Sequence, residues 1–421
     1  MQEMQLAYGS GTINLAFAED RFEVLSSNVT QRQPLSDLEI GQALDAPIDS
    51  PPLEELLKPG ETVLIVASDA TRATASAQLI NLLVRRVIQQ GVLPADITII
   101  FANGIHRPTT AAEKQELLTP FIAQRIKVID HNAYDEKQLT LLGETERGTP
   151  VELSRALTEF SRVILTGGIN FHYFAGFTGG RKSICPGLAS ARTIEATHML
   201  ALDFERGGRR SGVGIGKLDG NAVHEECERV AALIGPAFSI NAVVDERGRA
   251  TQVFAGDWRA AHRKACDQYL GEHSTKIAET RDVVIASCGG DPYDINLIQA
   301  HKTLEMAAGA CNEGGTIILL AECRDGLGRA DFLKWFDFED AAALESRLRE
   351  SYEVNGQTAW SLLTKAERFR VVIVSQLADE EVTRMRMTPA RSLNDALQML
   401  AGTERGFILP RGAALLPTLQ S

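Results

Sequence analysis

The chain has 421 residues, of which 55 are acidic and 43 basic, and its formal net charge is −12. Hydrophobic residues at 44% and charged residues at 23% are typical of a soluble globular protein, and this length predicts two or three domains. The acidic balance argues against a general nucleic-acid-binding protein. No long apolar run and no basic, signal-like start is present, so we expect a cytoplasmic protein without a membrane span.

Short apolar runs rich in β-branched residues alternate with amphipathic stretches along the chain. This alternation predicts an α/β fold with mainly parallel sheets. A polar stretch near residue 275 predicts two α/β domains, residues 1–275 and 276–421. Strands are expected at 62–67, 96–101, 126–130, 162–166, 282–286, 316–320 and 370–375, and helices at 77–90, 258–271 and 297–308.

The six cysteines show no C-x-x-C spacing, so a structural zinc site is not expected. In a cytosolic chain they are typical of reduced, buried small hydrophobic residues. They are Cys185, Cys227, Cys266, Cys288, Cys311 and Cys323.

Two polar clusters directly follow the first two predicted strands. Asp69, Thr71 and Arg72 lie in S-D-A-T-R, and His106 lies in N-G-I-H-R-P-T. Ligands bind at the carboxyl ends of the strands in open α/β sheets, and an arginine fork suits a carboxylate or phosphate. A helix cap at Asp69 and a surface charge at Arg72 are the structural alternatives. The glycine and proline near His106 predict a constrained turn that directs its imidazole into the crevice.

The strongest signal is the segment G-G-I-N-F-H-Y-F-A-G-F-T-G-G-R-K-S-I-C-P-G over residues 167–187. Six of its 21 residues are glycine, which lets backbone N–H groups approach an anion closely. His172 and Lys182 lie in it, and His198 follows in a stretch that is typical of a helix.

Two nucleotide-binding motifs are excluded by spacing. A P-loop requires the lysine directly after the glycine and then a helix, but Arg181 intervenes before Lys182 and Pro186 disfavours a helix. No G-x-G-x-x-G follows the first strand, so a dinucleotide Rossmann site is unsupported.

A fourth cluster opens the predicted second domain, after the strand at 282–286. Gln299 and Lys302 are three residues apart and would share one face of a helix. A solvated polar helix face is the structural alternative.

In order and spacing, these four clusters resemble the lactate racemase family that uses a nickel pincer nucleotide. The matching motifs are S-D-x-T-R, G-x-H-R-x-x-T, F-H-Y-F-A-G-F-T-G-G-R-K-S-I-C-P-G with a histidine sixteen residues after the lysine, and P-x-D-x-x-x-x-Q-x-x-K. The resemblance implies two α/β domains with the active site in the cleft between them. The first would bind the cofactor and carry the catalytic residues, and the second would contribute substrate-binding residues.

The resemblance also implies the cofactor and its attachment. Lys182 would carry a pyridinium mononucleotide through a thioamide, and His198 would be the one protein ligand of nickel, whose other donors are two sulfurs and a carbon of the cofactor. Square-planar nickel accepts such a donor set. The phosphate is expected along the glycine-rich loop, and the chain would depend on cofactor-biosynthesis proteins. The expected cofactor-binding residues are Asp69, Thr71, Gly176, Thr178, Gly179, Gly180 and Lys182.

The resemblance implies a racemase or epimerase of a 2-hydroxy acid, lactate-like or larger. His106 and His172 would be the acid/base pair, while the α-hydrogen moves as hydride to the cofactor and returns to the other face of a keto acid. Arg72, Gln299 and Lys302 would hold the substrate carboxylate. Ile298 stands where some members carry an aromatic residue, which would alter the substrate pocket.

Two alternatives use the same cofactor. A keto-acid-forming lyase or redox enzyme would release the intermediate, and a non-catalytic protein would store or sense the nucleotide. The presence of His106 and His172 argues against storage, because storage needs no acid/base pair.

Overall fold

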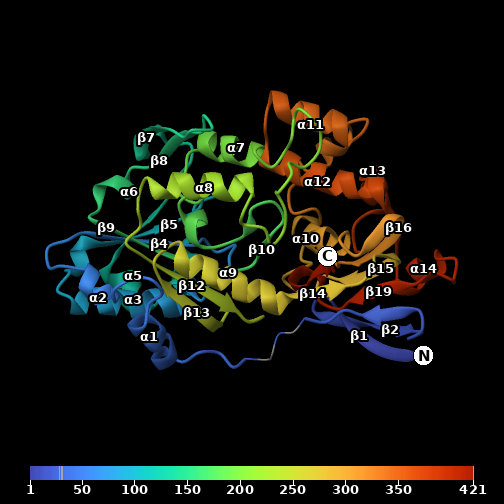
Figure 1. Ribbon diagram of the computed structural model, residues 1–421, viewed down its shortest axis with the longest axis horizontal. Helices are drawn as coiled ribbons and strands as arrows, with labels where there is room; N and C mark the ends of the chain where they lie inside the picture. Colours follow the sequence, from blue (N-terminus) through green and yellow to red (C-terminus); the bar gives the residue numbers. More distant parts are fainter. Residues whose placement is uncertain (28, 30–31, 421) are drawn as a thin grey trace. The chain divides into compact units, whose positions relative to one another are not determined.

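A computed structural model describes residues 1–27, 29 and 32–420 (Figure 1). The contacts divide the chain into two compact units. One, here called the central unit, comprises residues 30–202 and 209–270, and the other, the terminal unit, comprises residues 1–29, 203–208 and 271–421. The expected α/β class with mainly parallel sheets is confirmed. A domain boundary near residue 275 and an active site in a cleft between the domains stay predictions.

The central unit is built on a six-stranded sheet of order β13-β12-β9-β4-β5-β6. All neighbouring strands are parallel except the β12–β13 pair, which is antiparallel. Both β4 and β5 are buried along their whole length, as expected for strands covered on both faces. The strands are β4 (Val63–Ala67), β5 (Ile97–Phe101), β6 (Lys127–Asp130), β9 (Arg162–Gly168), β12 (Phe238–Val244) and β13 (Ala250–Gly256).

Helices cover the faces of this sheet, with α3 on one side of the strands and α7 and α8 on the other (Figure 1). The buried residues of α3 (Ser76–Gln89) are Leu79, Ile80, Leu83, Val84 and Val87, and this spacing presents one apolar face to the core. The other helices are α1 (Asp37–Asp45), α2 (Leu53–Leu56), α4 (Ala111–Leu117), α5 (Pro120–Arg125), α6 (Ala156–Glu159), α7 (Ala191–Met199), α8 (Ala222–Ala232) and α9 (Ala260–His273).

Two small hairpins and short 3-10 turns complete the central unit. The hairpins are β7 (Leu139–Glu144) with β8 (Pro150–Ser154), and β10 (Phe171–His172) with β11 (Gly176–Phe177). The turns are η1 (Pro94–Asp96), η2 (Glu136–Gln138) and η3 (Gly180–Ser183). The glycine-rich segment therefore folds as the β10–β11 hairpin followed by η3.

The terminal unit has its own six-stranded sheet, of order β18-β17-β16-β15-β19-β3, and every neighbouring pair is parallel. Its edge strand β3 comes from the first residues of the chain and pairs with β19 from the last. The strands are β3 (Phe22–Val24), β15 (Arg281–Ser287), β16 (Cys311–Leu320), β17 (Arg370–Val374), β18 (Thr388–Ala390) and β19 (Gly406–Leu409).

A hairpin, a second strand pair and five helices surround this sheet. The hairpin is β1 (Gln2–Tyr8) with β2 (Gly11–Phe17), and the pair is β14 (Ser274–Ile277) with β20 (Leu416–Leu419). The helices are α10 (Leu297–Ala307), α11 (Ala341–Glu350), α12 (Val354–Arg368), α13 (Asp379–Arg384) and α14 (Leu393–Gln398), with 3-10 turns η4 (Leu333–Phe336) and η5 (Gly412–Ala414).

All seven predicted strands and all three predicted helices are confirmed, most of them to within two residues at each end. Strand β16 begins five residues earlier than predicted, at Cys311. All six cysteines are buried free thiols. In the part of the chain that the structure describes, no helix is both long enough and apolar enough to cross a membrane.

Candidate active site

The predicted residues of the first two clusters meet at the carboxyl edge of the central sheet. Asp69 follows β4 and His106 follows β5, and these strands are parallel neighbours. His106 Nδ1 lies 2.7 Å from Asp69 Oδ2. The other carboxylate oxygen of Asp69 accepts hydrogen bonds from the N–H and hydroxyl of Thr71, at 3.0 and 2.6 Å. Asp69 therefore orients an imidazole and does not cap helix α3, which begins only at Ser76.

The Asp69 carboxylate is buried, whereas the His106 side chain is 45% exposed. Burial opposes ionisation of Asp69, but hydrogen bonds from His106 and Thr71 outweigh it and hold the pKa of that carboxyl below its usual value. The charge of exposed Arg72 acts in the same direction. The result is an ionised carboxylate behind an accessible imidazole, an arrangement that favours Nδ1–H and leaves the lone pair on Nε2.

His172 lies at the end of β10, and backbone groups of the β10–β11 hairpin contact its imidazole ring. The backbone N–H of Ala175 donates to His172 Nδ1 at 3.2 Å, and that of Phe174 lies 3.5 Å from the same atom. Because Nδ1 accepts, the proton of the neutral ring is on Nε2. His106 and His172 are thus held in opposite tautomers by their local partners.

Lys182 follows the hairpin in η3 and is half-buried. Burial, together with the charges of Arg181 and Arg72, lowers the pKa of Lys182 to about 7. A substantial fraction of its amine is therefore neutral near neutral pH, and a neutral amine is nucleophilic.

His198 lies near the end of α7, within the expected helix, and its side chain is buried. Its Nδ1 lies 2.8 Å from the carbonyl oxygen of Ile194, one helical turn earlier, so Nδ1 carries the proton and Nε2 the lone pair. Burial, and then the charge of Lys182, lowers the pKa of His198 to about 3. The ring is therefore neutral, the form that binds a metal ion.

The aromatic ring of Phe174 lies against three of the predicted residues. Its centroid is 4.5 Å from that of His172, 5.0 Å from that of His198 and 5.7 Å from Lys182 Nζ. Phe174 is itself only 4% exposed. Phe174 is not among the predicted site residues, although it stands two residues after His172 in the F-H-Y-F motif. It is the contact that joins these three side chains into one site.

The glycine-rich loop is packed tightly against its own protein. A Cβ at Gly176, whose φ is +78°, would lie 2.0 Å from the carbonyl oxygen of Lys217. At Gly180 a Cβ would lie 2.6 Å from the ring of His262. Close packing therefore explains these two glycines without reference to a ligand.

Backbone and side-chain groups of the same loop also have partners within the chain. The Gly180 N–H donates to Asn241 Oδ1 at 2.9 Å, and this oxygen also lies close to Gly179. The Thr178 N–H donates to Asn170 O at 2.9 Å. The Thr178 hydroxyl donates to Gly168 O at 2.6 Å. A phosphate role for this loop stays a prediction, and the Gly180 and Thr178 N–H groups would have to exchange these partners to serve it.

Gln299 and Lys302 lie in the terminal unit, on helix α10, which Asn296 caps through a hydrogen bond from the Gln299 N–H at 3.0 Å. Lys302 Nζ donates to Gln299 Oε1 at 2.5 Å, so the two side chains share one helix face as the spacing predicts. Their placement beside the residues of the central unit stays a prediction.

The described residues contain no group of three or more His, Cys, Asp and Glu side chains that could hold a metal ion. A metal at His198 would therefore need donors that the chain does not supply. The arrangement provides an accessible base, a hydrogen-bond donor, a nucleophilic amine and a neutral imidazole with a lone pair. These groups suit proton transfer beside a covalently held cofactor.

Comparisons with known proteins show the family of the chain. Residues 8–208 match the family model described as Lactate racemase N-terminal domain, and residues 277–406 match Lactate racemase C-terminal domain. A lactate racemase of Lactiplantibacillus plantarum is 32% identical over 432 residues, covering 99% of this chain and 100% of that protein. A lactate racemase of Thermoanaerobacterium thermosaccharolyticum is 30% identical over 408 residues, covering 95% and 94%.

A solved structure shows the same fold. The lactate racemase apoprotein from Thermoanaerobacterium thermosaccharolyticum is similar with a TM-score of 0.90 and 27% identity, covering 99% of this chain and 100% of that one. Since two family models together match more than half of the sequence, and a relative is 32% identical over nearly the full length, the chain belongs to the lactate racemase family and is an isomerase of the racemase type.

Proposed function

We propose that this protein interconverts the enantiomers or epimers of a 2-hydroxy acid, with a nickel pincer nucleotide attached to Lys182 and nickel bound to His198. The observation that carries the proposal is the ring of Phe174, against which Lys182, His198 and His172 all lie. The names of the two relatives support lactate as the first substrate to test.

The residues fit the group that they would hold. Lys182 has a lowered pKa of about 7, which suits an amine that must form a thioamide bond. His198 is a neutral imidazole with its proton on Nδ1, which suits a single protein ligand of nickel. When bound, the cofactor would supply an acceptor for the substrate α-hydrogen as a hydride, which amino-acid side chains do not provide.

The chain's own acid/base groups act on the substrate hydroxyl. His106 Nε2 accepts the hydroxyl proton, and the resulting imidazolium is stabilised by the Asp69 carboxylate at 2.7 Å. Exposed Arg72 offers a planar donor fork for the substrate carboxylate. Lys302, held by Gln299 on α10, would add a second cation for that carboxylate.

His172 begins with a different role. Its Nδ1 accepts a hydrogen bond from the Ala175 N–H, so its Nε2 carries the proton and can donate a hydrogen bond to an oxygen. For His172 to accept a proton from the opposite enantiomer, the hydrogen bond from Ala175 must be broken or the ring must turn. The two histidines are therefore inequivalent in the ground state.

The test is to produce the protein with and without the cofactor-biosynthesis proteins that we expect it to need. Intact mass should rise by the cofactor only with those proteins present, and racemisation should follow the added mass. Lys182→Ala should lose both, whereas Lys217→Ala, an exposed lysine of the same unit, should keep both. Full racemisation by Lys182→Ala would show that the mechanism is wrong.

Substrate choice is tested with lactate, malate, aryl-lactates and sugar acids on the cofactor-bearing protein. We expect racemisation or epimerisation of at least one of them, without net release of keto acid. Stoichiometric free keto acid during turnover would instead indicate a lyase or redox enzyme.

A further inference from the structure

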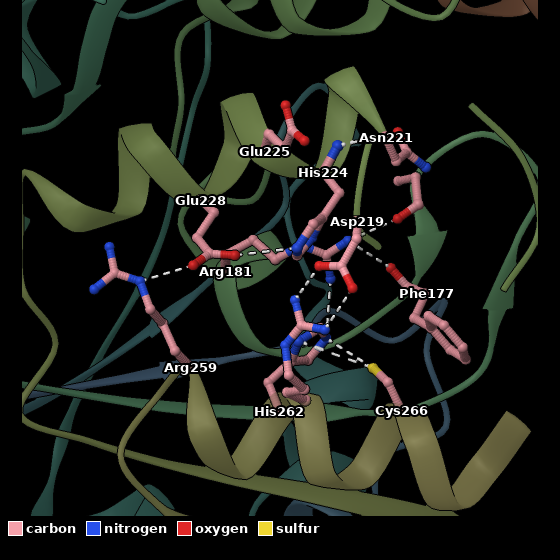
Figure 2. Close-up of polar contacts among 12 residues, drawn as sticks. Phe177, Arg181, Asp219, Asn221, His224, Glu225, Glu228, Arg259, His262 and Cys266 are labelled. Carbon is pink, nitrogen blue, oxygen red and sulfur yellow. Dashed lines mark hydrogen bonds and ion pairs between the residues drawn. The ribbon is translucent and has the colours of Figure 1, made fainter. Parts of the chain in front are cut away.

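A second concave region lies in the central unit between η3, helix α8 and the start of α9. A cavity of about 240 Å³ opens there, and it adjoins a larger one of about 570 Å³. The residues that line both cavities are Leu218, His224, Glu228, Arg259 and Arg263. Figure 2 shows His224 reaching down from α8 and His262 reaching up from α9 toward Arg181, which also lines the smaller cavity.

Arg181 is a buried guanidinium, only 1% exposed, and no carboxylate oxygen lies within hydrogen-bonding distance of it among the described residues. Its Nη atoms contact the carbonyl oxygens of Ala175, Phe177 and Gly179 and the ring of His262. Its Nε–H has no hydrogen-bond partner in the part of the chain that the structure describes. A buried donor without a partner is costly, and Glu228, whose charge partly offsets that of Arg181, makes no hydrogen bond to it.

His224 presents a second group of this kind. It is 4% exposed, and its Nε2 lies 3.0 Å from Glu228 Oε2. Its Nδ1 has no hydrogen-bond partner among the described residues. Two side chains that are more than nine-tenths buried, from different elements, thus each leave one nitrogen unpartnered beside the same cavity.

We propose that this cavity is a binding site for a tetrahedral oxyanion of the phosphate or sulfate class, held by Arg181 and by the protonated ring of His224. Arg259 and Arg263 line the same cavity and add positive charge, although each is paired with an acid, Glu228 and Asp219 respectively. An oxyanion supplies several acceptor oxygens at once, which matches two separated N–H donors.

A cation is disfavoured at the same place. The guanidinium of Arg181 cannot lose its proton at ordinary pH and repels a metal ion. No metal-binding group of three or more ligands occurs in the described part of the chain, here or elsewhere. We therefore expect the unpartnered Nδ1 of His224 to donate a hydrogen bond to the bound anion and not to coordinate a metal ion.

Binding should take up a proton. His224 donates through Nε2 to Glu228, so its Nδ1 can donate to an anion only when the ring carries both protons. Burial lowers the pKa of His224 in the free protein, and Arg181 and Arg263 act the same way, while Glu228 opposes them. A bound anion would raise that pKa, so lower pH favours binding. The groups that face His224 are Arg181, Asp219, Glu228, His262 and Arg263.

Sulfate is the probe, because its charge does not change over the relevant pH range. Calorimetric titration of the full-length, cofactor-free protein is done at pH 6 and pH 8, with chloride replacing sulfate at constant ionic strength. We expect one site that binds more tightly at pH 6, by up to about tenfold per pH unit. Absence of binding, or binding with no pH dependence, would overturn the proposal.

Variants locate the site. His224→Phe should abolish the tight, pH-dependent binding. Arg263→Gln should weaken it several-fold, whereas Arg249→Gln should leave it unchanged. Arg249 is a matched control, because it is paired with Asp245 and its side chain is 51% exposed, against 46% for Arg263. If His224→Phe does not fold, the comparison of Arg263→Gln with Arg249→Gln tests the proposal. Equal sulfate affinity of these two variants would contradict anion binding in this cavity.

The same titration on cofactor-bearing protein separates two sources of the anion. Loss of sulfate binding would assign the site to the phosphate of the nucleotide, and retained binding would assign it to a free anion. Either result agrees with the oxyanion chemistry. The titration of the cofactor-free protein does not depend on the proposed function. The anion site could therefore be wrong while the proposed function is correct, and the reverse also holds.

Discussion

The Nδ1 of His106 lies 2.7 Å from the Asp69 carboxylate, and this contact joins the ends of two neighbouring strands. Asp69→Asn would remove the charge that stabilises the His106 imidazolium while keeping the side-chain shape. We expect kcat to fall by about 10²- to 10⁴-fold, the usual contribution of a positioned acid/base group. Racemisation kinetics measure the loss, and intact mass should show unchanged cofactor attachment. Activity near that of the wild type would contradict the role of this pair.

Phe174→Leu should loosen the group of side chains around the cofactor. Lys182, His198 and His172 would each lose a ring contact, so we expect a smaller fraction of cofactor-bearing chains and a slower turnover. Phe171→Leu is the control, because Phe171 is buried in the same hairpin but packs on Phe177 and Tyr269. Both variants should lose comparable thermal stability, and only Phe174→Leu should lose loading. Equal loading of the two would be evidence against a positioning role for Phe174.

Lys182 should react as an amine with a pKa of about 7. Its acylation by acetic anhydride in the cofactor-free protein should rise with pH and level off above about pH 8, because the neutral amine is then fully formed. The lysine of a short reference peptide added to the sample should continue to gain reactivity up to about pH 10. Peptide mass spectrometry with isotope-labelled reagent measures both in one sample. Parallel profiles for the two lysines would rule out a lowered pKa at Lys182.

His301 should make the stability of the terminal unit sensitive to acid. It is 3% exposed, its Nδ1 contacts Ile298 O at 2.6 Å, and burial lowers its pKa to about 4. Above about pH 6.5 the ring is neutral in both the folded and unfolded chain, so pH has no effect through this group. Between about pH 6.5 and 4 only the unfolded chain binds the proton, so the free energy of unfolding decreases as the pH is lowered.

The slope from this one group is about 1.4 kcal/mol per pH unit. His301→Asn keeps a donor near the Nδ1 position and cannot be protonated, so the variant should lose less stability between pH 6.5 and 5. Urea unfolding at several pH values measures the difference. Identical pH dependence in the two proteins would show that His301 is not held neutral.

A buried ion pair joins α10 and α12. Lys365 and Glu305 contact each other at 6% and 7% exposure, and the hydroxyl of Ser361 also donates to Glu305. Lys365→Met would remove the positive charge beside this buried carboxylate, at a cost of about 3–5 kcal/mol in the free energy of unfolding. The double variant Glu305→Leu/Lys365→Met should recover much of this loss. Denaturant unfolding measures the stability of both variants. A small loss of stability in the single variant and a larger loss in the double variant would contradict a buried ion pair at this position.

The strands and their carboxyl-end clusters were predictable, because unalternated apolar runs and the polar residues after them are local signals. This is why Asp69 and His106 could be expected at one sheet edge. Their hydrogen bond could not, since it depends on which strands are neighbours. Phe174 was missed for a different reason: an aromatic residue in an apolar motif is typical of core packing, and only coordinates show its ring against three polar side chains.

The packing of the glycine-rich loop could not be predicted from the sequence. A ligand role for its glycines stays a prediction, while the close approach of Lys217 to Gly176 and of His262 to Gly180 comes from residues farther along the chain and leaves no local signal. The β1–β2 hairpin and β3 gave no sign of their partners either. The hairpin contacts Ser287 and Asp294, and β3 pairs with β19. Pairing between segments so far apart in the sequence leaves no local pattern.

The β3–β19 pairing also sets an order on biosynthesis. Strand β3 is translated early, but its neighbour in the sheet, β19, is translated nearly four hundred residues later. The sheet that contains β3 is therefore finished only at the end of translation, whereas the strands of the central sheet have all been made by Gly256. An affinity tag or deletion at the amino terminus would consequently act on the last part of the protein to assemble.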